Sequence, residues 1–365
     1  MSGNDIRDMF VDTAGRMLKD VCTKELLEAA DHGEWAGQLW SMLEESGMNL
    51  VPVPEEAGGV GGSFADALAI VREAGRFAPP VPLAETLLAN WLLSLVGLPV
   101  VTGPATVAPV SRQESVVLKR VDGGWELSGT AQYVPWARQV SSLIVVGDAP
   151  EGTAVAVVDP ARCVIQEGNN LANEARDTVR FDGVKVPEEA VAMAPAHVTK
   201  DDVYVRGALM RAALMAGALD RVLELSVQYA QERIQFGRPI ARFQAIQQQL
   251  AVLAGEVIAA NTAVESAMAL VERSDQERCS DARTAEHMGS MMAKITTGQA
   301  VQTATAIAHQ VHGAIGFTDE HLLHYFTRRL WSWRDEFGSE TEWAEKLGQQ
   351  VLNAQKELWP LVTSI

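Results

Sequence analysis

Three side chains suited to a planar, phosphate-bearing ligand occur in the short stretch RIQFGRPIARFQ: Arg233, Phe236 and Gln244. A guanidinium binds phosphate or stacks on an adenine ring, and a phenyl ring can stack on the same base. Gly237 and Pro239 are the poorest helix formers and lie between two helical patterns, so we predict a tight corner between two helices. The same residues could also form a plain turn in which Arg233 makes a surface ion pair, because short motifs often match by chance.

A second candidate binding segment is HQVHGAIGFTDEH, residues 309–321, where two glycines interrupt a helical pattern. Backbone N–H groups freed at such a break can bind a pyrophosphate, and Gln310 can cap the break. The residues that could take part are Gln310, Val311, His312, Gly313 and Ala314. The alternative is an ordinary helix end, because glycine commonly terminates helices and a single histidine near such an end is usually structural.

Other segments offer weaker evidence of chemistry. The stretch RRLWSWRDEFGSETEW, residues 328–343, has three tryptophans among charged residues, and we interpret these tryptophans as a core or subunit contact. The Gly-rich loop VPVPEEAGGVGG, residues 51–62, lacks the Lys-Ser/Thr pair of a phosphate-binding P-loop. The sequence offers neither a Ser-His-Asp order nor a cluster of His and Cys that could bind a metal.

The composition is that of a globular protein, with 365 residues of which 47% are hydrophobic and 21% charged, and the length predicts more than one domain. The net charge of -17 argues against a nucleic-acid or anionic membrane partner, since both need a basic face. The apolar segment 87–101 is too short to cross a bilayer. Three widely spaced cysteines, Cys22, Cys163 and Cys279, and an N-terminus without an apolar core predict a reduced, cytoplasmic protein.

The order of hydrophobic patterns predicts an α+β fold with three domains. Residues 1–103 form an N-terminal helical domain, residues 104–195 a small middle β domain, and residues 196–365 a C-terminal four-helix bundle. Short segments rich in Val, Ile and Thr predict strands at 106–110, 115–121, 125–129, 142–147, 153–159 and 178–186. Long amphipathic runs predict the helices of the bundle at 204–234, 241–272, 281–312 and 340–358.

Four stretches, in this order, resemble the acyl-CoA dehydrogenase family over nearly the whole chain. VPEEAGGVGGSFADALAIVREAGRF resembles its N-terminal Pro-Glu-x-x-Gly-Gly-x-Gly segment with the following helix, and DTVRFDGVKVPEEAV resembles the end of its β domain. YAQERIQFGRPIARFQAIQQQLA resembles its Arg-x-x-Phe-Gly…Phe-Gln motif, and HQVHGAIGFTDEHLL its Gln-x-x-Gly-Gly-x-Gly-Phe segment. The resemblance implies an FAD cofactor, an acyl-CoA substrate and an electron-transfer flavoprotein as electron acceptor.

The same resemblance gives the corner a role. Members of the family are dimers of dimers in which each FAD lies across a subunit interface. By this resemblance Arg233, Gln244 and the stretch Gln310–Ala314 reach the adenosine and pyrophosphate end of a neighbour's FAD, while Phe236 shapes the corner.

The chain departs from the family's pattern at the flavin ring and at the base. The family's ring-holding segments, Thr-Glu-x-x-x-Gly-Ser and a later Trp-Ile/Ser-Thr/Ser, are replaced by PATVAPVSRQES at 104–115 and TAQYVPWARQ at 130–139. The family's catalytic Glu precedes a Gly late in the chain, and Gly338 occupies that Glu position here. The position that some members use instead falls near Gly207, again without a carboxylate. The remaining candidates for a base that removes the α-proton are Asp335, Glu336 and Glu340.

These departures predict one subunit of a heterotetrameric (α2β2) FAD-dependent acyl-CoA dehydrogenase, which contributes half of an interfacial FAD site and lacks its own base. A homologous partner chain would supply the flavin loop and the base, as in some bacterial members of the family that act on sterol side chains or other bulky acyl groups. Two alternatives stay open. One is a self-sufficient homotetramer with a displaced base, and the other is a flavin-free scaffold or acyl-CoA-binding protein.

Overall fold

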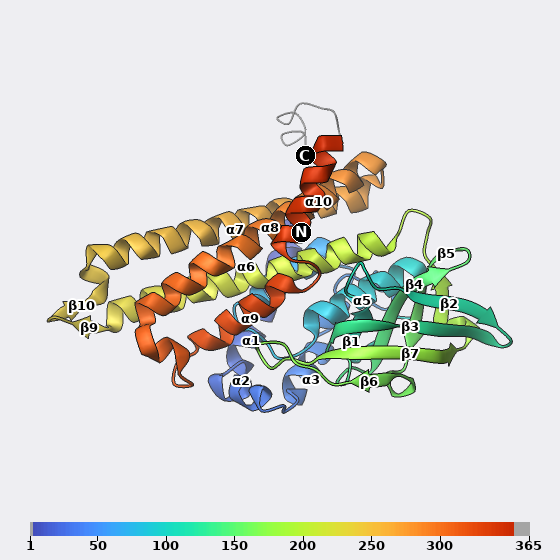
Figure 1. Ribbon diagram of the computed structural model, residues 1–365, viewed down its shortest axis with the longest axis horizontal. Helices are drawn as coiled ribbons and strands as arrows, with labels where there is room; N and C mark the ends of the chain where they lie inside the picture. Colours follow the sequence, from blue (N-terminus) through green and yellow to red (C-terminus); the bar gives the residue numbers. More distant parts are fainter. Residues whose placement is uncertain (1–2, 354–365) are drawn as a thin grey trace. The chain divides into compact units, whose positions relative to one another are not determined.

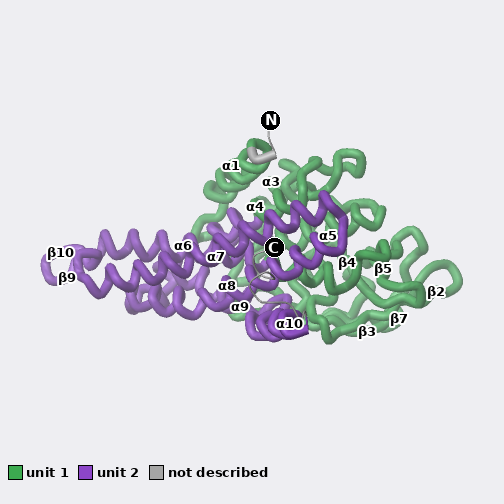
Figure 2. The backbone as a smooth tube through the Cα atoms, turned by 90° about the horizontal axis from the view of Figure 1, so that it is seen from above, with its two compact units in different colours: residues 1–70, 79–210 green, residues 71–78, 211–365 purple. Residues whose placement is uncertain are grey.

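The computed structural model describes residues 3–353 (Figure 1). They form two compact units, which Figure 2 shows in different colours. The first unit holds the residues up to Ile70 together with Pro79–Met210, and the second holds Val71–Ala78 together with the residues from Arg211 onward. The order of helices, sheet and helices confirms the predicted α+β fold. The division into three domains stays a prediction, and the predicted β domain lies within the first unit.

Helices form the N-terminal part of the first unit. They are α1 (Gly3–Val21), α2 (Lys24–Asp31), α3 (Gly37–Glu45), η1 (Met48–Leu50), η2 (Glu55–Ala57), α4 (Phe64–Gly75), whose last turn belongs to the second unit, and α5 (Leu83–Val96). α5 is buried on nearly all sides, in line with the apolar composition of this segment. The glycines of the loop before α4 allow it to fold on its own backbone, because a Cβ at Gly59 would lie 2.1 Å from the carbonyl oxygen of Val53.

A mixed eight-stranded sheet forms the rest of the first unit, in the order β6-β7-β3-β2-β4-β5-β8, with β1 paired parallel to β4. The strands are β1 (Ala105–Ala108), β2 (Val116–Val121), β3 (Gly124–Pro135), β4 (Ser142–Ala149), β5 (Gly152–Val158), β6 (Val164–Gln166), β7 (Arg176–Val186) and β8 (Val191–Met193). The six predicted strands are present. The prediction missed β6 and β8, because strands of three residues are too short to show an alternating pattern.

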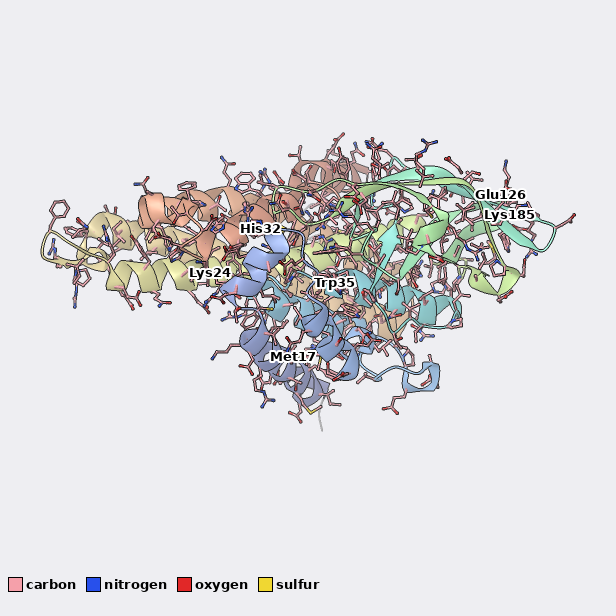
Figure 3. All side chains as sticks on the ribbon, turned by 90° about the horizontal axis from the view of Figure 1, so that it is seen from below. Met17, Lys24, His32, Trp35, Glu126 and Lys185 are labelled. Atoms are coloured by element: carbon pink, nitrogen blue, oxygen red, sulfur yellow. The ribbon has the colours of Figure 1, made fainter. Side chains whose placement is uncertain are left out.

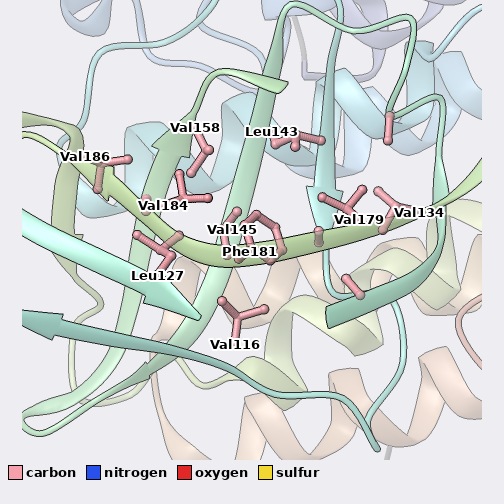
Figure 4. Close-up of a cluster of buried hydrophobic side chains, with 14 of the residues drawn as sticks. Val116, Leu127, Val134, Leu143, Val145, Val158, Val179, Phe181, Val184 and Val186 are labelled. Atoms are coloured by element: carbon pink, nitrogen blue, oxygen red, sulfur yellow. The ribbon is translucent and has the colours of Figure 1, made fainter. Parts of the chain in front are cut away.

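Alternating apolar side chains of these strands pack into one core, part of which Figure 4 shows around Leu127, Val145 and Phe181. On the register of β3 and β7, Glu126 lies opposite Lys185, a cross-strand pair of opposite charge that Figure 3 labels. β3 runs further than predicted, to Pro135, because a bulge between Ala131 and Val134 lets the strand continue past the turn-like residues there.

Long helices dominate the second unit. They are α6 (Lys200–Glu232), which begins in the first unit, α7 (Gln244–Glu277), α8 (Ser280–His312), α9 (Leu323–Asp335) and α10 (Glu340–Asn353). Short elements join them: β9 (Ile234–Gln235), β10 (Arg238–Pro239), η5 (Ile240–Arg242) and η6 (Gly313–Phe317). The four long helices appear where predicted, although residues 354–358 of the last one lie outside the described residues. α9 was not predicted as a helix, since its histidines, arginines and tryptophans obscure the periodicity.

Candidate functional site

The corner between α6 and α7 is a two-residue hairpin, in which β9 and β10 pair antiparallel. Its two turn residues, Phe236 and Gly237, have positive φ angles of 52° and 78°. Positive φ angles at both central residues are typical of the two-residue turns whose twist matches that of the paired strands in a hairpin. Figure 1 shows the hairpin at one end of the α6–α7 pair, so the predicted corner between two helices is present.

Phe236 is the most exposed aromatic side chain of the corner, with 91% of its surface accessible. A bulky residue with positive φ is strained by about 1–3 kcal/mol, and here the strained backbone holds an apolar ring in solvent. Its edge faces the ring of Phe243 at 6.1 Å, and the guanidinium of Arg238 lies 4.4 Å from the centre of that second ring. The corner therefore presents an exposed aromatic ring beside a cation–π pair to whatever binds there.

Three exposed arginines surround this hairpin: Arg233, Arg238 and Arg242. Among the residues that the structure describes, none of the three guanidinium groups forms an ion pair. The stretch 233–255 contains no Asp or Glu, so the corner is locally cationic in a chain whose net charge is -17. Such a cluster of unpaired cations favours an anionic ligand.

Gln244 is exposed and is the first residue of α7, a helix of 34 residues. The residue before it, Phe243, provides no side-chain cap for the N–H groups of the first turn. Those groups, with the positive end of the helix dipole, add to the attraction that the arginines exert on an anion. Gln244 therefore lies at the corner, at the N-terminus of α7, and its role in binding a cofactor stays a prediction.

In the second predicted segment, at the end of α8, some residues are buried and others are exposed. Gln310, Gly313 and Ala314 are exposed, whereas Val311 and His312 keep only 4% and 3% of their surface accessible. Only backbone groups of these two buried residues could face a ligand. The break at the glycine is real, since Gly313 ends α8 with a positive φ of 64°.

The structure brings the two predicted segments together. The ring of His312 stacks on Tyr229 of α6, with ring centres 4.6 Å apart. Tyr229 precedes Arg233 by one helical turn, and its carbonyl accepts the N–H of Arg233 at 2.8 Å. The His312 ring therefore makes a packing contact that holds the end of α8 beside the corner, and a part for His312 in binding a cofactor stays a prediction.

Other histidine rings lie close to the end of α8. The ring centre of His321 lies 4.6 Å from that of His312. Burial lowers the pKa of His309 and of His312, and it lowers the pKa of His321 to about 4. These rings are neutral at pH 7. The positive charge of this region therefore comes from the arginines.

Mild acid is expected to destabilise the chain through these histidines. In the folded chain His321 binds a proton only near pH 4, whereas an unfolded histidine does so near 6.5. Between these values the unfolded chain binds more protons, so the free energy of unfolding falls as the pH falls. The loss is at most about 1.4 kcal/mol per pH unit for a fully buried ring and smaller for the half-buried His321.

Thermal midpoints measured over a pH series between about 7 and 4.5 test this expectation. His321→Asn should give a flatter dependence on pH than the wild type, and His32→Asn, at an exposed position, should leave the dependence unchanged. Equal slopes for the wild type and the His321 variant would contradict it.

The three carboxylate candidates lie at the turn between α9 and α10, where Phe337 and Gly338 have positive φ angles of 53° and 87°. Glu336 accepts a hydrogen bond from the Arg211 guanidinium, Nε to Oε2, at 2.6 Å. Glu340 receives two hydrogen bonds from Arg334, which lower the pKa of its carboxyl group. Both of these carboxylates are committed to ion pairs.

Asp335 differs from its two neighbours. Asp335 as a residue is exposed, its carboxylate is partly covered, and it accepts no hydrogen bond from another described residue. Partial burial nevertheless raises its pKa, although Arg334 and Lys294 act in the opposite direction. A free carboxylate with a raised pKa is the form that a general base needs, so Asp335 is the strongest of the three candidates.

The positions that the family uses for a base carry no carboxylate here. Gly338 has a φ angle of 87°, which L residues rarely adopt, so the backbone itself disfavours a Glu at this position. Gly207 lies buried within α6. In the first unit, the segment 130–139 forms the end of β3 and its bulge, where Tyr133 has a positive φ and is 68% exposed.

Sequence reasoning missed four charged residues that the structure adds to these sites. Arg238 and Arg242 could have been found from the run of arginines without nearby acids. Arg211 and Lys294 could not, because they lie in long helical patterns and their partners are distant in sequence. Lys294, on α8, is fully buried, and burial lowers its pKa to about 7.

The chain matches the N-terminal domain of acyl-CoA dehydrogenases over residues 4–99 and their C-terminal domain over residues 205–339. Together the two matches span more than half of the sequence, and the chain belongs to the acyl-CoA dehydrogenase family. It is therefore an oxidoreductase of that family, as the resemblance in the sequence implied.

Relatives and solved structures cover nearly its whole length. The acyl-CoA dehydrogenase IpdE2 of Mycobacterium tuberculosis is 28% identical over 310 residues, which are 82% of this chain and 82% of that protein. IpdE2 of Mycolicibacterium smegmatis is 26% identical over 94% of this chain and 98% of its own.

The ChsE4-ChsE5 complex from Mycobacterium tuberculosis has a TM-score of 0.85 at 21% identity, over 98% of each chain. A variant of the Tcur3481-Tcur3483 steroid acyl-CoA dehydrogenase has the same TM-score at 22% identity, over 97% of this chain and 99% of that one. At these identities the likeness shows the fold.

Proposed function

We propose that this chain is one subunit of an FAD-dependent acyl-CoA dehydrogenase that binds the adenosine diphosphate end of an FAD held mainly by a homologous partner chain. The observation that carries the proposal is the corner between α6 and α7. It presents a strained, 91% exposed Phe236 among three arginines that have no ion pair within the described part of the chain. A free surface of this kind is unusual unless a partner or ligand covers it.

The residues of the corner fit half of an FAD. The arginines and the N-terminus of α7 suit the diphosphate, and the exposed ring of Phe236, with Phe243 at a right angle beside it, suits the adenine. FAD bound there would accept the hydride that leaves the acyl chain. This chain's part would be to bind and orient the dinucleotide end, with Arg233 and Gln244 as the side chains that reach it.

This chain offers weaker support for the catalytic base and for the loop that holds the flavin ring. Glu336 and Glu340 are held in ion pairs, and the family's base position is Gly338, with a backbone that disfavours a carboxylate. A partner that supplies the flavin-ring loop and the base would complete the site. The fold likeness to a subunit of the ChsE4-ChsE5 complex, which joins two different chains, supports a homologous partner of this kind.

The outer face of α7 is the surface that we assign to this partner. α7 contains a long apolar stretch, yet only 28% of this stretch is buried. Val252 and Ile258 are 51% and 65% exposed, and no charged residue lies between Arg242 and Glu256. Because α7 packs along α8 and continues from the corner, a helix of a homologous chain is a better occupant than a lipid bilayer.

The further parts of the proposal follow the family. The substrate is an acyl-CoA thioester, with steroid or lipid breakdown as the setting that the steroid enzyme among the structural neighbours supports. Electrons would pass from the FAD to an electron-transfer flavoprotein, and the enzyme would work in the cytoplasm.

A second candidate function is a self-sufficient homotetramer in which Asp335 is the base. It is favoured by the free carboxylate of Asp335 and by its raised pKa, which would make it a stronger acceptor for the α-proton of the thioester. In that case Asp335→Asn should lower turnover by about a hundredfold or more, as loss of a general base does. In the heterotetramer the same variant should leave turnover nearly unchanged.

Flavin content and native mass test the proposal. The chain is expressed alone and together with a homologous candidate partner, and bound FAD is quantified per chain. We expect a colourless or dimeric product alone, and about half an FAD per chain in the co-expressed tetramer. A yellow homotetramer with about one FAD per chain would overturn the half-site proposal and favour the second candidate.

A further inference from the structure

Lys294 lies within α8 and has none of its surface accessible. Its ammonium group donates to the carbonyl oxygens of Trp333 and Arg334, at 3.1 and 2.5 Å. These carbonyls belong to the last turn of α9, where a helix leaves its carbonyl groups without partners inside the helix. A cation at this end also interacts favourably with the helix dipole. Lys294 therefore caps α9 from a neighbouring helix.

Charged groups from every element packed around the turn face this lysine. They are Arg211 of α6, Asp335 of α9, Glu336 of the turn and Glu340 of α10, and Glu340 in turn pairs with the Arg334 guanidinium. With Lys294 they make three cations and three carboxylates, so the cluster is balanced. Burying an ammonium group costs several kcal/mol, and an apolar side chain of similar volume would often serve stability as well. Stability alone is therefore a weak explanation for a lysine here.

The turn that this cluster holds has the features of a constrained functional segment. Phe337 has a positive φ and is buried, and its carbonyl accepts the indole N–H of Trp343 at 2.9 Å. Strained residues of this kind persist where the surroundings fix them, and they concentrate at active sites and ligand clamps. The free carboxylate of Asp335 lies directly before this strained segment.

We propose that Lys294 is a positioning residue for the turn Asp335–Ser339. By holding the last carbonyls of α9 it fixes the direction in which the Asp335 carboxylate leaves the helix, and its charge favours the ionised form of that carboxylate. The catalytic consequence rests on the second candidate function, in which Asp335 is the base. The positioning itself does not depend on it.

The test uses the folded protein and needs no substrate. Carbodiimide coupling of glycine ethyl ester, quantified on the Asp335 peptide by mass spectrometry across a pH series, follows protonation of this exposed carboxyl group. Hydrogen exchange of the amides of residues 337–339 measures how firmly the turn is held. In Lys294→Met we expect Asp335 to be labelled up to a higher pH than in the wild type, because a cation that favours the carboxylate is gone. We also expect faster exchange in the turn.

Two further variants separate charge from simple packing. Lys294→Gln keeps an N–H donor for the carbonyls of α9 but removes the charge. If the Met variant does not fold, the same two measurements are made on this variant. Lys119→Met removes one lysine charge at an exposed position of β2 and should change neither measurement. Unchanged Asp335 labelling and unchanged exchange in both Lys294 variants would overturn the proposal, even if their thermal midpoints fall.

Kinetics of the assembled enzyme connect the inference to catalysis. If Asp335 is the base, Lys294→Met should lower kcat/KM for an acyl-CoA substrate, with ferrocenium as acceptor, at least about tenfold and should shift the acid side of the pH profile to higher pH. If Asp335→Asn leaves turnover unchanged, the second candidate function fails. The labelling result would still decide whether Lys294 positions the turn.

Discussion

Replacing Arg211 by methionine is expected to lower the free energy of unfolding by about 3–5 kcal/mol. The Arg211 guanidinium lies 2.6 Å from the Glu336 carboxylate, and the two side chains are only 2% and 12% exposed. Removing the cation leaves a nearly buried carboxylate without its partner, which is far more costly than losing a surface ion pair. Urea denaturation followed by circular dichroism measures the change.

Two further variants identify the cause. Arg180→Met breaks an ion pair with Asp182 whose members are 54% and 56% exposed, so it should cost less than about 1 kcal/mol. Adding Glu336→Gln to Arg211→Met should recover part of the loss, since no unpaired charge then remains. If Arg211→Met and Arg180→Met had equal effects, the buried pair would not be what holds the turn.

Features with a local cause were predictable from the sequence. The long helices follow from 3.6-residue periodicity, the six longer strands from Val- and Ile-rich alternation, and the corner from Gly237 and Pro239. The prediction of the corner succeeded because a glycine and a proline restrict the backbone wherever they stand. Arg233 and Gln244 flank that break, and their part in binding a cofactor stays a prediction.

Features that depend on tertiary contact were not predictable. Arg211 and Glu336 are 125 residues apart, and Lys294 meets the carbonyls of α9 about forty residues later in the chain. A buried lysine in a helix rich in Ala and Thr has the same sequence pattern as an exposed one. For that reason sequence reasoning named three equivalent carboxylates, whereas the structure distinguishes Asp335 from the two that are paired.

The two sites differ in how their charges are satisfied, and this difference bears on the function. The α9–α10 turn balances its cations and carboxylates within the chain, so it needs no further ion. At the corner, the guanidinium groups of Arg233, Arg238 and Arg242 have no counter-ion within residues 3–353. An exposed aromatic ring is unfavourable in water, and a cluster of unpaired cations attracts an anion, so a ligand or partner that covers both is favoured here. The corner is therefore where an anionic partner group is most needed.

Arg233→Ala should consequently weaken retention of FAD by the assembled enzyme about ten- to a hundredfold. A charge-assisted hydrogen bond to a phosphate contributes about 1.5–3 kcal/mol, and each 1.4 kcal/mol is a factor of ten in affinity. The side chain is exposed and has no ion pair within residues 3–353, so its loss should not disturb the fold. Ultrafiltration of the co-expressed tetramer at graded dilution, with FAD fluorescence in the filtrate, gives the dissociation constant.

The matched control is Arg273→Ala, because this arginine is also exposed on the second unit but pairs with Glu277 on its own helix. It removes the same charge from the chain and should leave FAD retention unchanged. Arg238→Ala should have an intermediate effect, since its guanidinium stacks on Phe243 as well as facing solvent. If Arg233→Ala retains FAD as well as Arg273→Ala does, the corner is only a turn, and the half-site proposal loses the observation that carries it.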